Sequence, residues 1–161
     1  MHKQLVWLAI FLGGCATSPY PIEYKTLNGS WNSTEILTFN LEETALHSPH
    51  HLYFHLRNTD AYAYSNIFLI ARLKDTTQTY FADTLEYAMA TPQGNWLGKG
   101  FGEVKESVLW WKESIQIETK GPVTIELEHA MRTFGQTQGV PVLTGIVNVG
   151  LGLAPQNKEN K

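Results

Sequence analysis

The chain has 161 residues, with 12 basic and 15 acidic side chains and a formal net charge of −3 at pH 7. This length fits one domain, and the scattered lysines and arginines lack the basic patch that nucleic-acid binding needs. We therefore expect no nucleic-acid partner. The single cysteine cannot close an intramolecular disulfide, and zinc sites usually need several Cys and His ligands together.

The first residues have the layout of a secretory signal. A basic start at His2 and Lys3 leads through the apolar run 5–12 into Leu12-Gly13-Gly14-Cys15, and the run is too short to span a bilayer. A leucine three residues before a cysteine resembles the bacterial lipobox. That resemblance implies a signal peptide over residues 1–14, cleavage before Cys15 and acylation of its sulfur, with more than one acyl chain for stable anchoring in the lipid bilayer. The alternative is that Cys15 is an ordinary small apolar residue.

The remaining chain divides into a tether, one domain and a tail. Residues 15–31 contain Pro19, Pro21 and Asn28-Gly29 with little periodicity, which indicates a lipidated tether. Residues 32–154 form the predicted single domain, and residues 155–161 a polar tail. Within the domain, apolar runs, most of them alternating with period two and separated by polar turns, predict strands over residues 35–41, 52–58, 65–73, 79–89, 107–118, 121–131 and 145–154.

Two of these strands carry further information. Residues 67–70 are apolar on both faces, which favours a central strand covered on both sides. In residues 145–154, Val147, Val149, Leu151 and Leu153 form one face, whereas Gly150 and Gly152 lie on the other, where another segment can approach closely. Several strands without a long amphipathic helix predict an all-β fold, an antiparallel β-sandwich of immunoglobulin-like or jelly-roll type. The pattern does not choose between these topologies.

None of the residues that could carry chemistry indicates an enzyme. His47, His50, His51 and His55 suggest a metal site, but His51 and His55 would sit about 13 Å apart on a strand, so we interpret these histidines as solvated and expect no metal. The glycine-rich segment 94–103 lacks the Ser or Thr of a phosphate loop and predicts a turn that lets Trp96 and Phe101 pack. With no nucleophile motif either, we predict no catalytic residues and no cofactor.

The aromatic residues are the better candidates for binding. Trp110 and Trp111 are adjacent, so in a strand one faces the core while the other lies under a loop, or is exposed to a partner or a sugar. Tyr62 and Tyr64 precede a predicted strand, and the Arg132 guanidinium can close a buried ion pair or meet a partner's carboxylate. We take Tyr62, Tyr64 and Arg132 as candidate partner-binding residues, and Trp110 and Trp111 as candidate saccharide-binding residues.

Five segments together resemble one family. These are "LRNTDAYAYSNIFL", "DTLEYAMATPQGNWLGKGFG", "LWWKE", "HAMR" and "GIVNVGL", in the order in which they occur in the GldH gliding-motility lipoproteins of the Bacteroidetes group. Two departures are His129, where the family pattern has glutamine, and the ending "GLGLAP". The resemblance has no catalytic residues to carry over and supports only Cys15 as a functional residue.

The resemblance implies a lipoprotein that works with the gliding machinery and its associated secretion system. Its expected partners are other envelope proteins, bound by protein–protein docking. An envelope saccharide-binding module is the alternative, and hydrolysis is the weakest hypothesis. The residues after Cys15, "ATSPYP", lack the acidic run that directs surface display, which favours the periplasmic face of the outer membrane.

Overall fold

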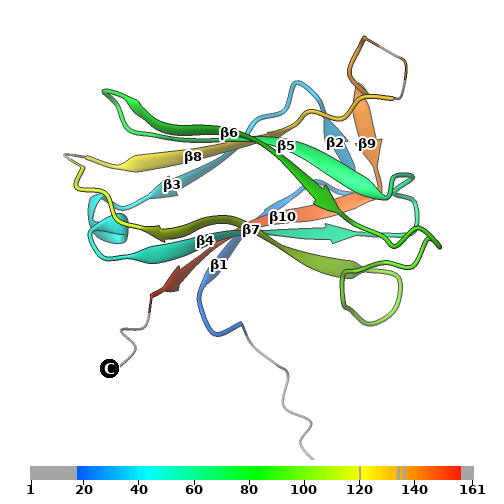
Figure 1. Ribbon diagram of the computed structural model, residues 1–161, viewed down its shortest axis with the longest axis horizontal. Coiled ribbons are helices and arrows are strands. Elements are labelled where there is room, and N and C mark those ends of the chain that lie inside the picture. Colours follow the sequence, from blue (N-terminus) through cyan, green and yellow to red (C-terminus); the bar gives the residue numbers. More distant parts are fainter. Residues whose placement is uncertain (1–17, 120, 134, 136, 157–161) are drawn as a thin grey trace, which may run out of the picture.

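The computed structural model describes residues 18–119, 121–133, 135 and 137–156. Two four-stranded antiparallel sheets pack face to face, with a two-stranded ribbon at one end (Figure 1). Sheet A consists, in spatial order, of β1 (Ile22–Thr26), β10 (Ile146–Pro155), β4 (His50–Asn58) and β7 (Lys105–Ile115). Sheet C consists of β3 (Leu37–Leu41), β8 (Val123–His129), β5 (Asn66–Lys74) and β6 (Thr79–Ala88). The ribbon pairs β2 (Ser30–Asn32) with β9 (Val142–Thr144), and a 3-10 turn, η1, covers Glu43–Leu46.

The connectivity is that of a jelly roll. β1 pairs with β10, β2 with β9, β3 with β8, β4 with β7, and β5 with β6, all antiparallel. These nested pairs form one long ribbon, which is wrapped so that β10 also pairs with β4 and β8 with β5. The predicted all-β antiparallel sandwich is confirmed, and of the two proposed types the pairing is that of the jelly roll.

Period-two alternation accounts for the core. On β4 the side chains of Leu52, Phe54 and Leu56 point inward and are fully buried, while Tyr53 and Arg57 point outward. β8 alternates in the same way. The largest fully buried side chains come from both sheets, from β2, from η1 and from the residue after β6: Trp31, Phe39, Leu46, Leu52, Phe54, Leu56, Ile67, Leu69, Leu73, Met89, Ile125 and Leu127. Burial of each large apolar side chain stabilises the fold by about 1.5–3 kcal/mol.

The last strand follows its predicted pattern with one irregularity. Val149 and Leu151 are buried as expected, but the register shifts between Ile146 and Asn148. This bulge removes Val147 from the inward face, and Ile146 takes the buried position instead. The glycine face lies on the outside of sheet A.

Two expectations from the sequence are wrong. The tether predicted over residues 15–31 cannot extend past residue 21, because β1 and most of β2 fall within that range and pair with β10 and β9. Their signal was weak because β1 is an edge strand with a partly exposed, polar sequence. β5 is central in sheet C but is covered on one side only: Phe68 and Ile70 face outward and are half-buried. Of the residues described, none belongs to a helix long and apolar enough to cross a membrane.

Candidate functional site

The outer face of sheet A gathers aromatic side chains from four segments. Tyr24 lies on β1, Tyr53 on β4, Trp110 on β7, and Tyr20 just before β1. The ring of Tyr53 stacks on Tyr20 at 5.5 Å and meets Trp110 edge-on at 5.1 Å. Val108, next to Trp110 along the outward side of β7, completes the group. We call these five residues the aromatic face.

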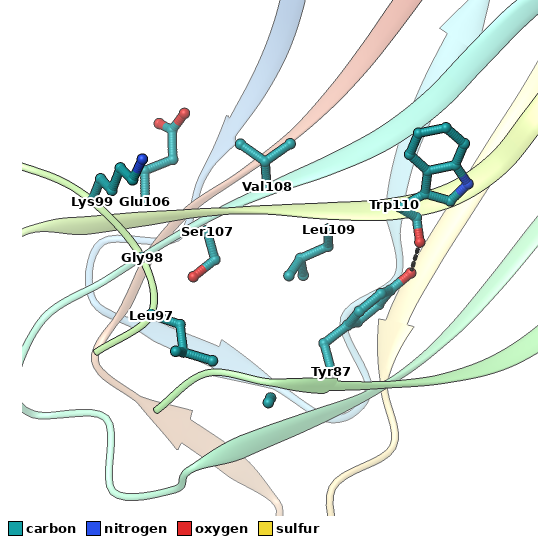
Figure 2. Close-up of a pocket in the computed structure, with 10 residues that line it drawn as sticks. Tyr87, Leu97, Gly98, Lys99, Glu106, Ser107, Val108, Leu109 and Trp110 are labelled. Atoms are coloured by element: carbon teal, nitrogen blue, oxygen red, sulfur yellow. Dashed lines mark hydrogen bonds between the residues drawn. The ribbon is translucent and has the colours of Figure 1, made fainter. Parts of the chain in front are cut away.

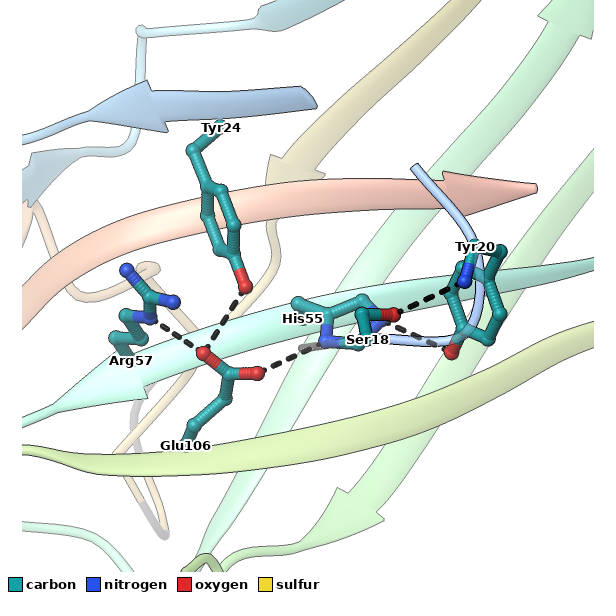
Figure 3. A network of polar contacts seen from close by, with 6 residues as sticks. All are labelled: Ser18, Tyr20, Tyr24, His55, Arg57 and Glu106. Atoms are coloured by element: carbon teal, nitrogen blue, oxygen red, sulfur yellow. Dashed lines mark hydrogen bonds and ion pairs between the residues drawn. The ribbon is translucent and has the colours of Figure 1, made fainter. Parts of the chain in front are cut away.

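A polar network lies beside these rings, centred on Glu106 of β7 (Figure 3). Its carboxylate accepts hydrogen bonds from the Tyr24 hydroxyl at 3.0 Å, from His55 Nδ1 at 3.1 Å and from Arg57 Nε. With the Nδ1 proton of His55 facing the carboxylate, Nε2 lies 3.2 Å from the Tyr20 hydroxyl and can accept its proton. The Arg57 guanidinium also lies 4.1 Å from the Tyr24 ring centroid. The network thus joins β1, β4 and β7 to the segment before β1.

Burial and hydrogen bonding shift the pKa values in this network. Burial alone would raise the pKa of Glu106, but hydrogen bonds from Arg57, His55 and Tyr24 outweigh it and hold the pKa below its usual value. Burial, together with the hydrogen bond to Glu106, raises the pKa of Tyr24 to about 12. Glu106 is therefore ionised and Tyr24 is a neutral donor at neutral pH, which is the combination that these contacts require.

Two glycines of β10 make room for the tyrosine rings. A Cβ on Gly152 would lie 2.5 Å from Cε2 of Tyr20, and a Cβ on Gly150 would lie 2.8 Å from the ring of Tyr24. The prediction that another segment approaches the glycine face of residues 145–154 is confirmed, and that segment is the N-terminal end of the described chain. The N-terminal segment is thus held against the outside of sheet A.

A groove opens at the other edge of sheet A, between β7 and the end of β6. Figure 2 shows the side chains of Tyr87, Leu97, Ser107 and Leu109 around it, whereas Val108 and Trp110 point to the opposite side of β7. We call it the β7 groove; its volume is about 630 Å³. Ser107 is buried, and among the described residues its Oγ has no hydrogen-bond partner. The groove is therefore mainly apolar, with one unsatisfied hydroxyl.

The backbone of β7 is open along this groove. Glu106 exchanges two hydrogen bonds with Lys99, at 2.8 and 2.9 Å, on the side away from β4. In an antiparallel strand the peptide groups of Val108 and Trp110 point the same way. The Trp110 carbonyl accepts from the Tyr87 hydroxyl, but the outward groups of Val108 pair with no other backbone in the part of the chain described. β7 is an open edge strand beyond Glu106.

The glycine-rich segment after β6 shapes this opening. A Cβ on Gly98 would lie 2.8 Å from Ser107 Oγ, and one on Gly100 would lie 2.2 Å from the Val104 carbonyl oxygen, so only glycines allow the loop to pack here. The Trp96 indole donates to Asp60, which agrees with the predicted packing of that ring. The expectation for Phe101 is wrong, because its side chain is fully exposed.

The predicted partner-binding residues lie in different environments. Tyr62 is 3% exposed and donates its hydroxyl proton to the Asn66 carbonyl, so it is a core residue and not a surface contact. Tyr64 is half-buried, with its ring 5.6 Å from that of Tyr62. Arg132 is exposed and borders a separate cavity of about 190 Å³. Contacts among the described residues join Tyr62 to Tyr64, but neither to Arg132.

The two tryptophans face opposite ways, as their adjacency predicts. Trp111 is 6% exposed, stacks on Phe54 at 5.1 Å and donates its indole proton to Asp83, so it is a core residue and not a saccharide platform. Trp110 is 46% exposed on the aromatic face. Trp110 thus stays a candidate contact for a partner, and Trp111 does not.

The histidines and the cysteine complete the predicted residues. His55 is 3% exposed, so its interpretation as a solvated turn histidine is wrong, and strand β4 places it in the Glu106 network. His47, His50 and His51 are exposed or half-buried. Within the described ranges, no three His, Cys, Asp or Glu side chains gather as metal ligands would. Cys15 lies outside the described residues.

Comparison with known proteins identifies the family. A family model described as GldH lipoprotein matches residues 21–153. The chain belongs to the GldH lipoprotein family. The gliding motility lipoprotein GldH homolog of Christiangramia forsetii is 35% identical over 145 residues, covering 90% of this chain and 89% of that protein. The gliding motility lipoprotein GldH of Flavobacterium johnsoniae is 34% identical over 146 residues, covering 91% of each chain. The predicted identity as an envelope lipoprotein associated with gliding motility is thereby confirmed.

Two solved structures are distantly similar to this GldH family member. Dimeric latent PorU from Porphyromonas gingivalis has a TM-score of 0.30 and 12% identity, covering 93% of this chain and 14% of that one. Desmodium yellow mottle tymovirus has a TM-score of 0.25 and 13% identity, covering 99% and 100% of the two chains. These scores are too low to support a shared function.

Sequence reasoning missed most of the site in this GldH family member. Tyr20 and Tyr24 lie within the predicted tether. Glu106 lies one residue before the predicted strand 107–118, whereas β7 begins at Lys105. Three of the network residues are 30 or more positions apart along the chain, so only the pairing of β1, β10, β4 and β7 brings them together. One available signal was the alternation of Tyr53, His55 and Arg57 opposite a buried face.

Proposed function

We propose that this lipoprotein is a non-catalytic docking component of the gliding machinery that binds an extended segment of another envelope protein along the β7 groove. Cys15, acylated, would hold it in the membrane. The observation that carries the proposal is the open edge of β7, with outward backbone groups at Val108 beside an apolar groove. An extended peptide is the partner that supplies backbone N–H and C=O groups for such an edge.

The chemistry of the groove supports the same kind of occupant. Leu97 and Leu109 offer apolar contacts for alternate side chains of an added strand, and Leu97 is 52% exposed in the chain on its own. The unpartnered hydroxyl of Ser107 offers a donor and an acceptor to a peptide group. A buried hydroxyl without a partner destabilises the fold by about 1–3 kcal/mol, and a bound segment that satisfies it would remove this penalty.

The polar network supports a non-catalytic role. A histidine that acts as a general base needs a free ring nitrogen within reach of a substrate proton. His55, however, is almost fully buried, with Nδ1 bonded to Glu106 and Nε2 to Tyr20. Its hydrogen bonds instead connect β4 to Glu106 of β7 and to Tyr20 in the segment before β1.

The expected location is the periplasmic face of the outer membrane. The sequence "ATSPYP" after Cys15 carries no acidic run that would direct surface display. On this proposal the partners are proteins of the gliding machinery or of its associated secretion system.

The test is crosslinking of the native lipoprotein in intact cells, followed by affinity recovery and mass spectrometry. The decisive variant is Leu97→Asp, which places a charge in the groove at an exposed position. Ile36→Asp is the matched control, because Ile36 is similarly exposed but precedes β3. We expect the wild type and Ile36→Asp to recover the same partner and Leu97→Asp to lose it. Equal recovery by all three proteins would overturn the groove as the docking site.

A second variant tests the unpartnered hydroxyl. Ser107→Ala removes the hydroxyl without adding bulk, so we expect unchanged or higher thermal stability together with weaker recovery of the partner. Tyr64 and Arg132, the candidates from the sequence, are replaced in a separate experiment. If their replacement abolishes recovery of the partner while Leu97→Asp still recovers it, the docking site lies on the surface around Tyr64 and Arg132 and not in the β7 groove.

The saccharide alternative gives a different result in the same experiments. Recovery of the lipoprotein alone, together with glycan-array binding that Trp110→Ala abolishes, would replace peptide docking by glycan binding at the aromatic face.

A further inference from the structure

The described chain begins on the outer side of sheet A. Tyr20 stacks on Tyr53 and contacts His55, and the absence of a side chain at Gly152 gives its ring room. Ser18 therefore lies close to this face, and its side chain accepts a hydrogen bond from the Tyr20 amide (Figure 3). Cys15 precedes Ser18 by three residues, which span at most about 11 Å when extended. A lipid anchor at Cys15 therefore places the bilayer surface near the aromatic face.

The side chains exposed on that face suit a lipid surface. Val108 is 55% exposed and Trp110 46% exposed, and Tyr53 lies between Tyr20 and Trp110. Tryptophan and tyrosine favour the headgroup region of a bilayer, because their rings are apolar while their N–H and O–H groups stay hydrated. The nearby carboxylate of Glu106 is already neutralised by Arg57, so it adds little repulsion toward anionic lipid.

The outer face of sheet C has a different character. There Arg72 pairs with Glu128 at 2.7 Å and Lys74 with Glu126 at 2.5 Å. Paired charges of this kind suit water and would have to be desolvated to enter a headgroup layer. Of the two outer faces, as far as the structure describes them, only that of sheet A combines closeness to Ser18 with exposed aromatic and apolar side chains.

We propose that the aromatic face of sheet A docks on the headgroup region of the membrane that holds the Cys15 anchor. This inference rests on the acylation of Cys15 given under the proposed function, but not on the partner in the β7 groove. The contact is intramolecular once the anchor is inserted, so even a weak interfacial affinity is enough to hold the domain down. The sandwich would then lie with sheet A on the bilayer and with the β7 groove at its side, open to a partner in the periplasm.

The test uses the full lipoprotein reconstituted into vesicles of phosphatidylethanolamine and phosphatidylglycerol. Acylation occupies the sulfur of Cys15, the only cysteine, so one added cysteine can be labelled alone with an environment-sensitive fluorophore. Val108→Cys places the label on the aromatic face, and Thr84→Cys, exposed on the outer face of sheet C, is the matched control. We expect lipids that carry a nitroxide near the headgroup to quench the label at residue 108 and not at residue 84.

The possible results separate the two proposals. Equal quenching at both positions, or quenching at neither while the protein floats with the vesicles, would overturn the membrane-facing orientation and leave the groove proposal intact. Failure of the lipoprotein to float with vesicles would overturn the anchor itself and the orientation with it. Quenching at residue 108 that persists in Leu97→Asp, when that variant has lost its partner, would show that membrane contact and docking are independent.

Discussion

The two outer faces of this sandwich are built from the same strand alternation but differ in what they expose. The outer face of sheet C carries Phe68 and Ile70, half-buried, beside the ion pairs of Arg72 and Lys74. Sheet A instead presents tyrosine and tryptophan rings, with its charged groups drawn into one hydrogen-bonded network around Glu106. The difference shows that outward residues of a jelly roll need not form a uniform solvated surface.

The largest expected effect is a difference in unfolding free energy between a side chain on the buried face of sheet A and one on its outer face. Trp111→Ala removes a buried ring that stacks on Phe54 and should destabilise the protein by about 3–5 kcal/mol. Trp110→Ala removes a half-exposed ring and should cost only about 1 kcal/mol. Urea unfolding of both variants measures the difference. Equal losses would mean that the aromatic face serves the stability of the fold and not a contact with another molecule.

The next effect compares a carboxylate on each outer face. Glu106→Gln removes the negative charge and replaces one acceptor oxygen by an NH2 donor, so one amide oxygen is left for the donors of Tyr24, His55 and Arg57, and the expected loss is about 2 kcal/mol of unfolding free energy. Glu126→Gln breaks a partly exposed pair with Lys74, for which we expect less than about 1 kcal/mol. Denaturant titrations at neutral pH give both values. A Glu126→Gln loss as large as that of Glu106→Gln would contradict the contrast between a shared network and isolated pairs.

The pH dependence of stability should also distinguish the sheets. Hydrogen bonds hold the folded pKa of Glu106 below its usual 4.5, so its contribution is present above that pH and is lost as the pH falls through the folded pKa. His129, on the inner side of β8, has its pKa lowered by burial below the usual 6.5. An unfolded chain then binds the extra proton first, so stability falls as the pH decreases below about 6.5.

Single substitutions should separate the contributions of His129 and Glu106 to the pH dependence of stability. His129→Gln, which keeps a polar side chain but removes the titrating ring, should flatten the pH profile of stability just below 6.5 and leave the loss of stability in acid unchanged. Glu106→Gln should reduce only the loss of stability in acid, to which Asp75 also contributes because hydrogen bonds from Thr77 and Tyr80 lower its pKa. Thermal unfolding across pH 3–8 measures both slopes. A wild-type profile that is flat between pH 7 and pH 5 would contradict the assignment to a buried, neutral His129.

The smallest effect tests how the segment before β1 is held. Gly152→Ala puts a Cβ against the Tyr20 ring at 2.5 Å, so the ring must move from the aromatic face at a cost of about 1 kcal/mol. Gly139→Ala is the control, because its Cβ would make an ordinary contact at 3.5 Å with the Met131 carbonyl. Limited proteolysis should cut before β1 faster in Gly152→Ala only. Unchanged cleavage would show that Tyr20 does not hold this segment.

Much of the fold was predictable because its strands have one strongly apolar side. The burial of Leu52, Phe54 and Leu56 followed from their spacing, as did the opposite directions of Trp110 and Trp111. β1 was not predictable, because as an edge strand it buries little apolar surface, and Tyr24, like Tyr20 before the strand, reads as a loop residue. The bulge at Val147 could not be predicted from the sequence either, because a one-residue shift in register depends on the pairing with the neighbouring strand.

The candidate site was less predictable than the fold. Tyr62 and Trp111 were chosen for residue type, and both fill the core, because the type of an aromatic residue does not say which side of a strand it occupies. Glu106, His55 and Tyr24 meet only through strand pairs between distant parts of the chain, which single-sequence periodicity does not give. Of the two adjacent tryptophans, Trp110 is the exposed one, and the sequence alone had left that choice open.

The position of β10 between β1 and β4 has a consequence for the order of events during synthesis. Sheet A cannot close until the last strand is available, because β1 contacts the rest of that sheet through β10. On the proposal that Cys15 is acylated, a chain that leaves the cytoplasm with its N-terminus first would present Cys15 to the acylating enzymes while the sandwich is still open. Anchoring would then precede folding, and the domain would complete its last strand pairs already tethered to the membrane.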